Sequence, residues 1–344
     1  MNRAPLRLAR RVLNICRLAS GLLVYRFTGR TPAYAYQAMI ALFCATRGAS
    51  NDLISKLIGL FRRPWRLARA DGVLGQMATA ADREKIVSQL RSRGYYLIER
   101  GLPDEVVTRL LNFALTQPCL SRAMDGQHRG AVVKGVYPRG EPGAVRYDFA
   151  TADLLANEDV QKLLADLSLL AVAQDYLGAR PRADVLSMWW HTAFSDVPDS
   201  EAAQLFHFDM DRPKWLKVFI YLTDVGSHNG PHSFVAGSHR SGGIPDHLLS
   251  KGYARLSDAE VAQAFAPCDV LQLTAPRGSI IIEDTRGLHK GRHVESGDRL
   301  MLQLQFSNSL FGGTYPEAKI GGSVCQELRD RIERFPELYA AYLP

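Results

Sequence analysis

The residue types that best indicate chemistry are His207, Asp209 and a much later histidine, His289. If His207 and Asp209 lie on a β-strand, their side chains project to the same face because successive side chains alternate. A histidine from a distant strand would then complete one face of an octahedron around a metal ion. Two imidazoles and one carboxylate with three open positions form the ligand set of non-haem Fe(II) oxygenases. The three residues therefore predict an iron site with room for a cosubstrate and dioxygen.

Other interpretations of these residues remain open at the level of sequence. His207 and Asp209 also fit a surface ion pair, and His293 competes with His289 as the second histidine. His289 and His293 form an H-x-x-x-H pattern, but Gly291 lies between them and no glutamate follows the first histidine. A helical zinc-protease motif is therefore disfavoured.

The segments around these residues are typical of strands that can position them. Four apolar or β-branched runs predict strands at residues 216–222, 232–235, 278–284 and 298–306. Asn229-Gly230-Pro231 is a strong turn signal between the first two runs. The third run is expected to deliver His289 from the loop at its end. Arg299 stands at the start of the fourth run, ten positions after His289.

This order of motifs resembles the phytanoyl-CoA dioxygenase family, a branch of the Fe(II)/2-oxoglutarate oxygenases. The resemblance covers roughly residues 80–312 and includes an upstream helix, strand and helix at residues 82–93, 95–99 and 103–117. It implies a double-stranded β-helix, or jelly-roll, core. His207, Asp209 and His289 would then bind Fe(II), and 2-oxoglutarate would chelate the same ion. The far carboxylate of 2-oxoglutarate would be bound by Arg299, whose guanidinium can grip a carboxylate through two hydrogen bonds.

The resemblance also bears on the type of reaction. Related halogenases have a small residue at the carboxylate position, so Asp209 favours hydroxylation or another C–H oxidation. The family commonly continues His-Gly-Ser after the distal histidine, whereas Lys290 and Gly291 follow here. The hydroxyl that helps to hold the cosubstrate is therefore not assigned, and Thr285 and Ser307 are weak candidates.

Several residues are expected near the site without being ligands. Lys217 is a charged residue inside an apolar strand, which indicates a cavity, although a lysine at a strand edge would look the same. Trp189 and Trp190 must face opposite sides of a strand. Four further histidines are interpreted as turn or supporting residues rather than ligands: His191, His228, His232 and His239.

The N-terminal region has a charge of its own. Residues 1–70 hold 12 Arg and one Lys against a single acid, a net charge of +12. The whole chain carries +7, so residues 71–344 carry −5, and charge gives no support for nucleic-acid binding by the core. Apolar and basic residues alternate over residues 6–23 as in an amphipathic helix, and shorter apolar stretches cover residues 33–45 and 53–61. Peripheral binding of residues 1–70 to an anionic membrane and a helical lid packed on the core are equally compatible with this pattern.

The length permits one large domain or two moderate ones. We expect a basic helical extension over residues 1–78 and a dioxygenase domain over residues 79–344. The five cysteines are scattered, with no C-x-x-C pair, which favours a reducing compartment. A cytoplasmic location is expected, with membrane association through the N-terminus, or a mitochondrial one if the arginine-rich start is a presequence.

The predicted fold class is mainly β with flanking helices, a jelly-roll core wrapped by N- and C-terminal helices. Further expectations are a loop near the site mouth at residues 120–142, a helix at 157–177 ended by Gly178, a helical insert near 257–265, and closing helices at 324–335 and 337–342.

Three functions compete. The leading one is an Fe(II)/2-oxoglutarate-dependent dioxygenase that hydroxylates an unactivated C–H bond of a small-molecule or lipid-like substrate, consuming dioxygen and releasing succinate and CO2. The second is a catalytically silent jelly-roll protein held at membranes by its basic N-terminus. The third is a cupin-type metal-dependent isomerase or hydrolase, which would work without oxygen.

Overall fold

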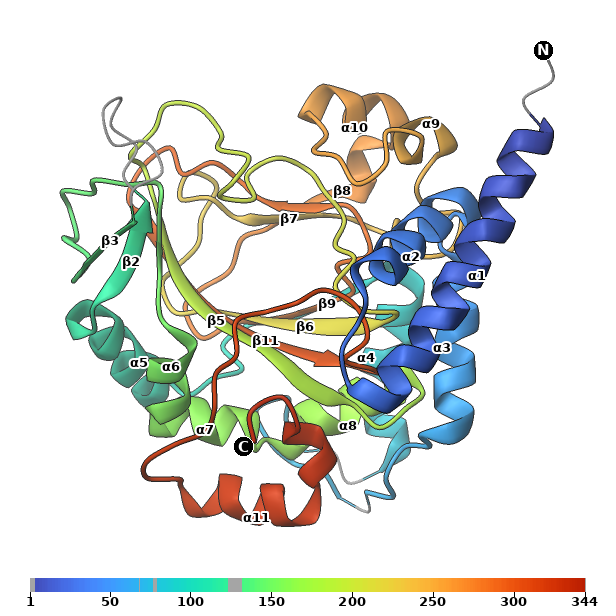
Figure 1. Ribbon diagram of the computed structural model, residues 1–344. Coiled ribbons are helices and arrows are strands. Elements are labelled where there is room, and N and C mark those ends of the chain that lie inside the picture. The colour runs from blue at the N-terminus through green and yellow to red at the C-terminus, as the bar shows by residue number, and fades with distance from the viewer. Residues whose placement is uncertain (1–3, 68, 77–78, 123–131, 344) are drawn as a thin grey trace.

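Two antiparallel sheets form the centre of the computed structural model, which describes residues 4–67, 69–76, 79–122 and 132–343 (Figure 1). The larger sheet has eight strands in the order β1-β9-β6-β11-β5-β4-β2-β3, and the smaller has three in the order β10-β7-β8. The strands of the larger sheet are β1 (Tyr95–Ile98), β9 (Ile280–Glu283), β6 (Trp215–Tyr221), β11 (Asp298–Ser307), β5 (Arg182–Thr192), β4 (Arg146–Asp148), β2 (Cys119–Arg122) and β3 (Val132–Gly135). Those of the smaller sheet are β10 (His289–Gly291), β7 (His232–Val235) and β8 (Val270–Leu273). The predicted fold class, a mainly β jelly-roll core with flanking helices, is confirmed.

The central strands are buried on both faces, and side-chain alternation divides them between core and site. On β11, Leu300, Leu302 and Leu304 pack into the main hydrophobic core. The intervening residues, Arg299, Met301 and Gln303, line a cavity between the sheets. β6 follows the same rule, which explains why a charged residue is tolerated inside it: Lys217 faces the cavity.

Helices cover the outer face of the larger sheet (Figure 1). They are α4 (Ala80–Arg93), α5 (Asp104–Thr116), α6 (Thr151–Ala156), α7 (Glu158–Leu164), α8 (Leu167–Leu177) and α11 (Gln326–Arg334), the last followed by a 3-10 turn at Pro336–Tyr339. The helix expected over residues 157–177 is thus two helices. The break has a local cause, because the side chain of Asp166 accepts a hydrogen bond from the backbone N–H of Leu169 and starts α8.

The segment of residues 120–142 is not the loop that was expected. It contains β2 and β3, which pair antiparallel and extend the sheet beyond β4. Residues 123–131 of that segment lie outside the described residues. The helical insert is present as α10 (Asp258–Ala264), preceded by a short α9 (Asp246–Leu249).

Three helices form the basic N-terminal region: α1 (Ala4–Thr28), α2 (Ala33–Thr46) and α3 (Ala49–Phe61). The apolar helix α2 packs against the segment that carries His207 and Asp209, where Phe43 stacks on Phe208 with ring centroids 5.4 Å apart. Leu18 of α1 and Leu42 of α2 share one hydrophobic cluster with Phe206 and Met210. No helix in the described part of the chain is long and apolar enough to cross a bilayer. The predicted domain boundary falls at residues 77–78, which lie outside the described residues.

Candidate metal centre

The three predicted ligands come together between the two sheets. The backbones of His207 and His289 pair as an isolated antiparallel bridge, with N–H to O=C distances of 3.0 and 2.8 Å. The N–H of Asp209 donates to the carbonyl of Thr285 at 2.8 Å. Backbone pairing alone therefore brings His207 and His289, 82 positions apart in the sequence, side by side. One ligand atom from each of His207, Asp209 and His289 lies within 4.8 Å of the others.

The hydrogen bonds of the two histidines leave the correct nitrogen free for a metal. Nδ1 of His207 is 2.9 Å from the carbonyl of Leu205, and Nδ1 of His289 is 3.0 Å from that of Gly287. A carbonyl only accepts, so each Nδ1 carries a proton, and in the neutral imidazole the Nε2 then presents a lone pair. Both Nε2 atoms face Asp209, at 3.7 and 3.4 Å from its carboxylate oxygens. This arrangement fits a metal ion held by two imidazoles and one carboxylate.

Lys217 fixes the charge of the carboxylate. Its ammonium lies 2.6 Å from Asp209 and 3.3 Å from Asp211. Burial acts to raise the pKa of Asp209, but Lys217 and the two histidines outweigh it and hold that pKa well below its usual range. Burial and the neighbouring His289 lower the pKa of His207 well below its ordinary value, so this ligand is neutral, as metal binding requires. His289 differs: burial acts to lower its pKa, but Asp209 outweighs burial and raises it.

A cavity of about 260 Å³ opens beside the three ligands. Its wall is mostly polar and aromatic, and besides the ligands and Lys217 it includes Arg146, Trp189, His191, Phe219, His232, Arg255, Arg299 and Gln303. Trp190 packs on the other side of β5 in the main core, so the two tryptophans face opposite ways as expected.

Arg299 is a buried cation without a counter-ion. It is 1% exposed, and it forms no ion pair with any described acid. Its guanidinium donates to the carbonyl of Gly230 and lies 2.5 Å from Nδ1 of His191. Burial lowers the pKa of Arg299 to about 10, which leaves it charged at neutral pH. A charge in this position is costly unless an anion enters the cavity beside it.

A second carboxyl group, Glu283, lies behind the site. It is fully buried, and one of its oxygens is 2.9 Å from Nε2 of His232. Burial raises the pKa of Glu283 to about 8. Reasoning from the sequence missed this residue, although an acid at the end of three isoleucines was the same kind of signal that marked Lys217.

The remaining candidates are placed elsewhere or already engaged. His293 is not in the ligand cluster or in the cavity wall. The hydroxyl of Thr285 accepts a hydrogen bond from the indole of Trp215 at 2.7 Å, and that of Ser307 donates to Asp184 at 3.0 Å. Neither lines the cavity, so neither is available to a cosubstrate there. The sequence predicts His289 in a loop, but in the structure His289 is the first residue of strand β10.

Residues 90–300 match the phytanoyl-CoA dioxygenase (PhyH) family, more than half of the chain, and the protein belongs to this family. The predicted cofactors, Fe(II), 2-oxoglutarate and dioxygen, agree with this family and with the His–Asp–His cluster. Among curated proteins, none matches this chain in sequence.

Solved structures with a similar fold are distant in sequence. HygX from Streptomyces hygroscopicus, with nickel and 2-oxoglutarate bound, is 17% identical with a TM-score of 0.46, over 71% of this chain and 93% of that one. The non-heme α-ketoglutarate-dependent carbocyclase SnoK from nogalamycin biosynthesis is 17% identical with a TM-score of 0.44, over 65% and 83%. The epimerase SnoN, in complex with Fe3+, α-ketoglutarate and nogalamycin RO, is 19% identical with a TM-score of 0.43, over 66% and 84%. Because these identities and TM-scores are low, the family assignment rests on the match of residues 90–300 to the PhyH family.

Proposed function

We propose that this protein is an Fe(II)/2-oxoglutarate-dependent dioxygenase that hydroxylates an unactivated C–H bond of a small-molecule or lipid-like substrate. The observation that carries the proposal is the combination of the ligand cluster with an uncompensated guanidinium in one cavity. A metal site alone would fit many enzymes. A buried cation that has no acid partner among the described residues, and that lines the same small cavity, favours an anionic ligand such as a dicarboxylate.

In this proposal His207, Asp209 and His289 hold the iron, with the metal-binding nitrogens set by the two backbone carbonyls described above. Arg299 binds the far carboxylate of 2-oxoglutarate. Iron, 2-oxoglutarate and dioxygen together supply the oxidising chemistry, with succinate and CO2 as co-products. Lys217 keeps Asp209 ionised and oriented through the 2.6 Å contact. The presence of Asp209 fills a ligand position with protein, which favours hydroxylation over halogenation.

The catalytically silent binding protein is the alternative function. The ligand cluster and Arg299 both argue against it, because a binding module needs neither a deprotonated metal-binding carboxylate nor a buried guanidinium beside it. The cupin-type isomerase or hydrolase differs from the leading proposal in needing no oxygen.

The test is the release of succinate from 2-oxoglutarate by purified protein supplied with Fe(II), ascorbate and a library of small amphiphilic and polycyclic compounds. We expect release that needs oxygen, is stimulated by a subset of the library, and is lost in Asp209→Ala. Incorporation of one ¹⁸O atom from labelled dioxygen into the product would identify hydroxylation. Product formed equally well under nitrogen, or unchanged in Asp209→Ala, would contradict the proposal.

A further inference from the structure

Exposed apolar side chains are concentrated on the N-terminal helices. Of 18 large apolar side chains exposed among the described residues, 12 lie between Leu8 and Phe61. On α1, Leu8, Val12 and Ile15 are exposed on one face of the helix, whereas Leu18, on the adjoining face, is buried. The two outer helices thus carry an apolar surface that no described residue covers, whereas α2 is packed into the molecule.

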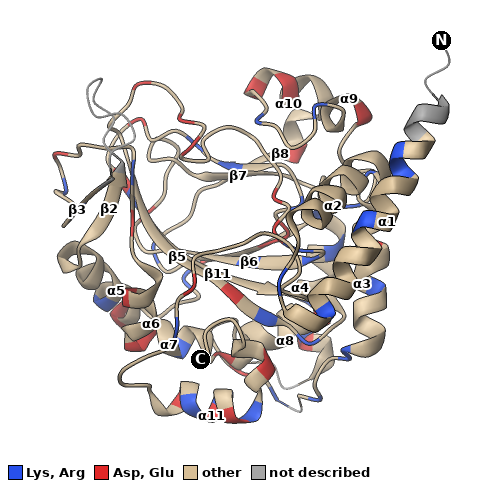
Figure 2. Cartoon of the chain, in the orientation of Figure 1, with Lys and Arg blue, Asp and Glu red and all other residues tan. Residues whose placement is uncertain are grey.

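The same helices carry basic side chains without partners. Arg10, Arg17 and Arg26 on α1 and Lys56 on α3 form no ion pair with any acid in the described ranges. Figure 2 shows these helices with blue segments and almost no red, in contrast to the mixed colours of α11. Apolar and basic side chains on one exposed surface are the combination that binds the interface of an anionic bilayer.

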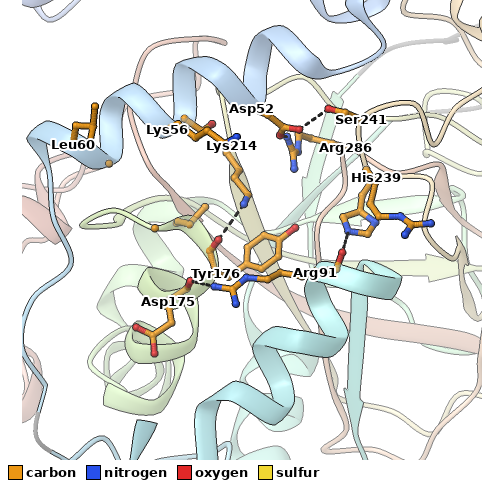
Figure 3. Close-up of a pocket in the computed structure, with 15 residues that line it drawn as sticks. Asp52, Lys56, Leu60, Arg91, Asp175, Tyr176, Lys214, His239, Ser241 and Arg286 are labelled. Carbon is orange, nitrogen blue, oxygen red and sulfur yellow. Dashed lines mark hydrogen bonds and ion pairs between the residues drawn. The ribbon is translucent and has the colours of Figure 1, made fainter. Parts of the chain in front are cut away.

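A cavity of about 630 Å³ lies between α3 and the body of the molecule (Figure 3). None of the three metal ligands lines it. On the α3 side, its wall is formed by Asp52, Ser55, Lys56, Gly59 and Leu60. The residues that line the rest include Arg91, Asp175, Tyr176, Lys214, His239, Arg240, Ser241 and Arg286. The spacing of the α3 residues places them on one helix face. The neighbouring face carries the exposed Leu53, Leu57 and Leu60, so the apolar surface begins at the rim of the cavity.

The charges in this cavity favour an anion. Arg286 is neutralised by Asp284 at 2.7 Å and Asp52 at 2.8 Å. Lys214 has no such partner: its ammonium donates to the carbonyl of Tyr176 at 3.0 Å, lies 4.2 Å from the centre of the Tyr176 ring, and forms no ion pair with a described acid (Figure 3). Burial, with Arg286 nearby, lowers the pKa of Lys214 to about 8. Two donor positions of this ammonium therefore remain for a ligand.

We propose that α1 and α3 dock on an anionic lipid bilayer and that the cavity beneath α3 receives the phosphate of a lipid headgroup. Leu57, Leu60 and Phe61 enter the acyl-chain boundary, while Lys214 and Lys56 contact the phosphate. Charge decides between a bilayer and a second copy of the chain, because two copies paired through this surface would bring unpaired arginines together. This inference does not depend on the identity of the reaction in the metal centre.

Co-sedimentation with vesicles tests the docking surface. Full-length protein is mixed with vesicles of phosphatidylcholine alone or of phosphatidylcholine with phosphatidylglycerol. We expect binding to the anionic vesicles only, weakened by added salt. The double variant Leu57→Asp/Leu60→Asp should bind at least roughly tenfold more weakly, since it removes apolar contacts and adds repulsion. Val133→Asp is the matched control, since Val133 is 54% exposed on β3 at the opposite side of the molecule, and it should bind like the parent protein.

The headgroup cavity is tested separately. Lys214→Met should weaken binding to anionic vesicles about fivefold, the effect of one basic residue at an anionic surface. Lys134→Met on β3 should leave binding unchanged. All variants are first compared with the parent protein by circular dichroism and thermal unfolding.

Four results would overturn the proposal or one of its two parts. Equal binding to both kinds of vesicle would exclude charge recognition, and unaltered binding of the Leu57/Leu60 variant would exclude this surface. A concentration-dependent dimer that the same variant abolishes, with no vesicle binding, would assign the surface to self-association. If Lys214→Met abolishes binding of free glycerol phosphate but leaves vesicle binding intact, the cavity is a site for a soluble phosphate and not for a headgroup.

Discussion

Replacement of Arg299 by glutamine is the perturbation for which the structure gives the clearest magnitude. The guanidinium is 1% exposed, contacts the carbonyl of Gly230 and His191, and has no acid partner among the described residues. Loss of one member of a buried, hydrogen-bonded charge pair costs about 2–4 kcal/mol, because the other charge is left unpaired. The far carboxylate of 2-oxoglutarate would be that other charge. We therefore expect 2-oxoglutarate to bind roughly 30- to 700-fold more weakly to Arg299→Gln.

The assay is a calorimetric titration of the Fe(II)-loaded protein with 2-oxoglutarate in the absence of oxygen. Fe(II) affinity is measured in the same preparation and should be unchanged, since Arg299 contacts none of the three ligands. Arg139→Gln is the control. Arg139 forms an ion pair at 2.8 Å with Asp298, the residue before Arg299. The Arg139 side chain is 44% exposed and does not line the cavity. This control should change 2-oxoglutarate affinity by less than about twofold.

Arg299→Lys separates charge from geometry. It keeps the positive charge but loses the two parallel donors, so an intermediate loss of roughly tenfold is expected. If both substitutions of Arg299 left 2-oxoglutarate affinity within a factor of two of the parent protein, the assignment of this residue to the cosubstrate would be wrong.

Two further predictions concern stability. Burial lowers the pKa of His239 to about 4 from an ordinary 6.5, so between these values the unfolded chain binds a proton that the folded chain does not, and stability falls as the pH is lowered through that window. In urea unfolding of the metal-free protein, His239→Gln should flatten this dependence by up to about 1.4 kcal/mol per pH unit, and an unchanged slope would exclude a neutral buried His239. Leu302→Ala, at a fully buried position in the centre of β11, should lower the free energy of unfolding by about 2–5 kcal/mol, whereas Leu120→Ala, 39% exposed on β2, should lower it by less than about 1 kcal/mol.

The parts of the fold that the sequence predicts well are those governed by local periodicity. The run that contains Lys217 becomes β6 within one residue of its expected start and end, and the run that begins at Asp298 becomes β11. Alternation also predicts the division between core and cavity along these strands, because it depends only on the period of the side chains. The resemblance to the family, confirmed over residues 90–300, rests on the same motifs.

The errors arise where non-local pairing or capping decides the structure. His289 was expected in a loop, but its pairing with Phe234 on β7 makes it a strand residue. The polar segment 120–142 pairs with β4 through contacts that have no periodic signature. The side chain of Asp166 divides an expected helix in two, and a single capping residue inside a helical pattern is hard to distinguish from a surface acid.

Within the site, the sequence indicated the ligands but not their surroundings. Glu283 and the contact between Arg299 and His191 depend on which side chains face each other across the sheet, and spacing alone does not give this register. For the N-terminal region, the sequence left a membrane anchor and a packed lid as equal alternatives. In the structure α2 packs on the core, while α1 and α3 each keep one exposed side. Membrane binding by that exposed side is the proposal made above.

The central claim is that His207, Asp209 and His289 together bind Fe(II) and position 2-oxoglutarate on it. Its most direct test is the visible charge-transfer absorption of the protein mixed with Fe(II) and 2-oxoglutarate without oxygen. We expect a band that saturates at one Fe(II) per chain and is absent in both His207→Ala and Asp209→Ala, with folding intact by circular dichroism. A folded parent protein that gives no band, or a band that survives in both variants, would contradict the claim.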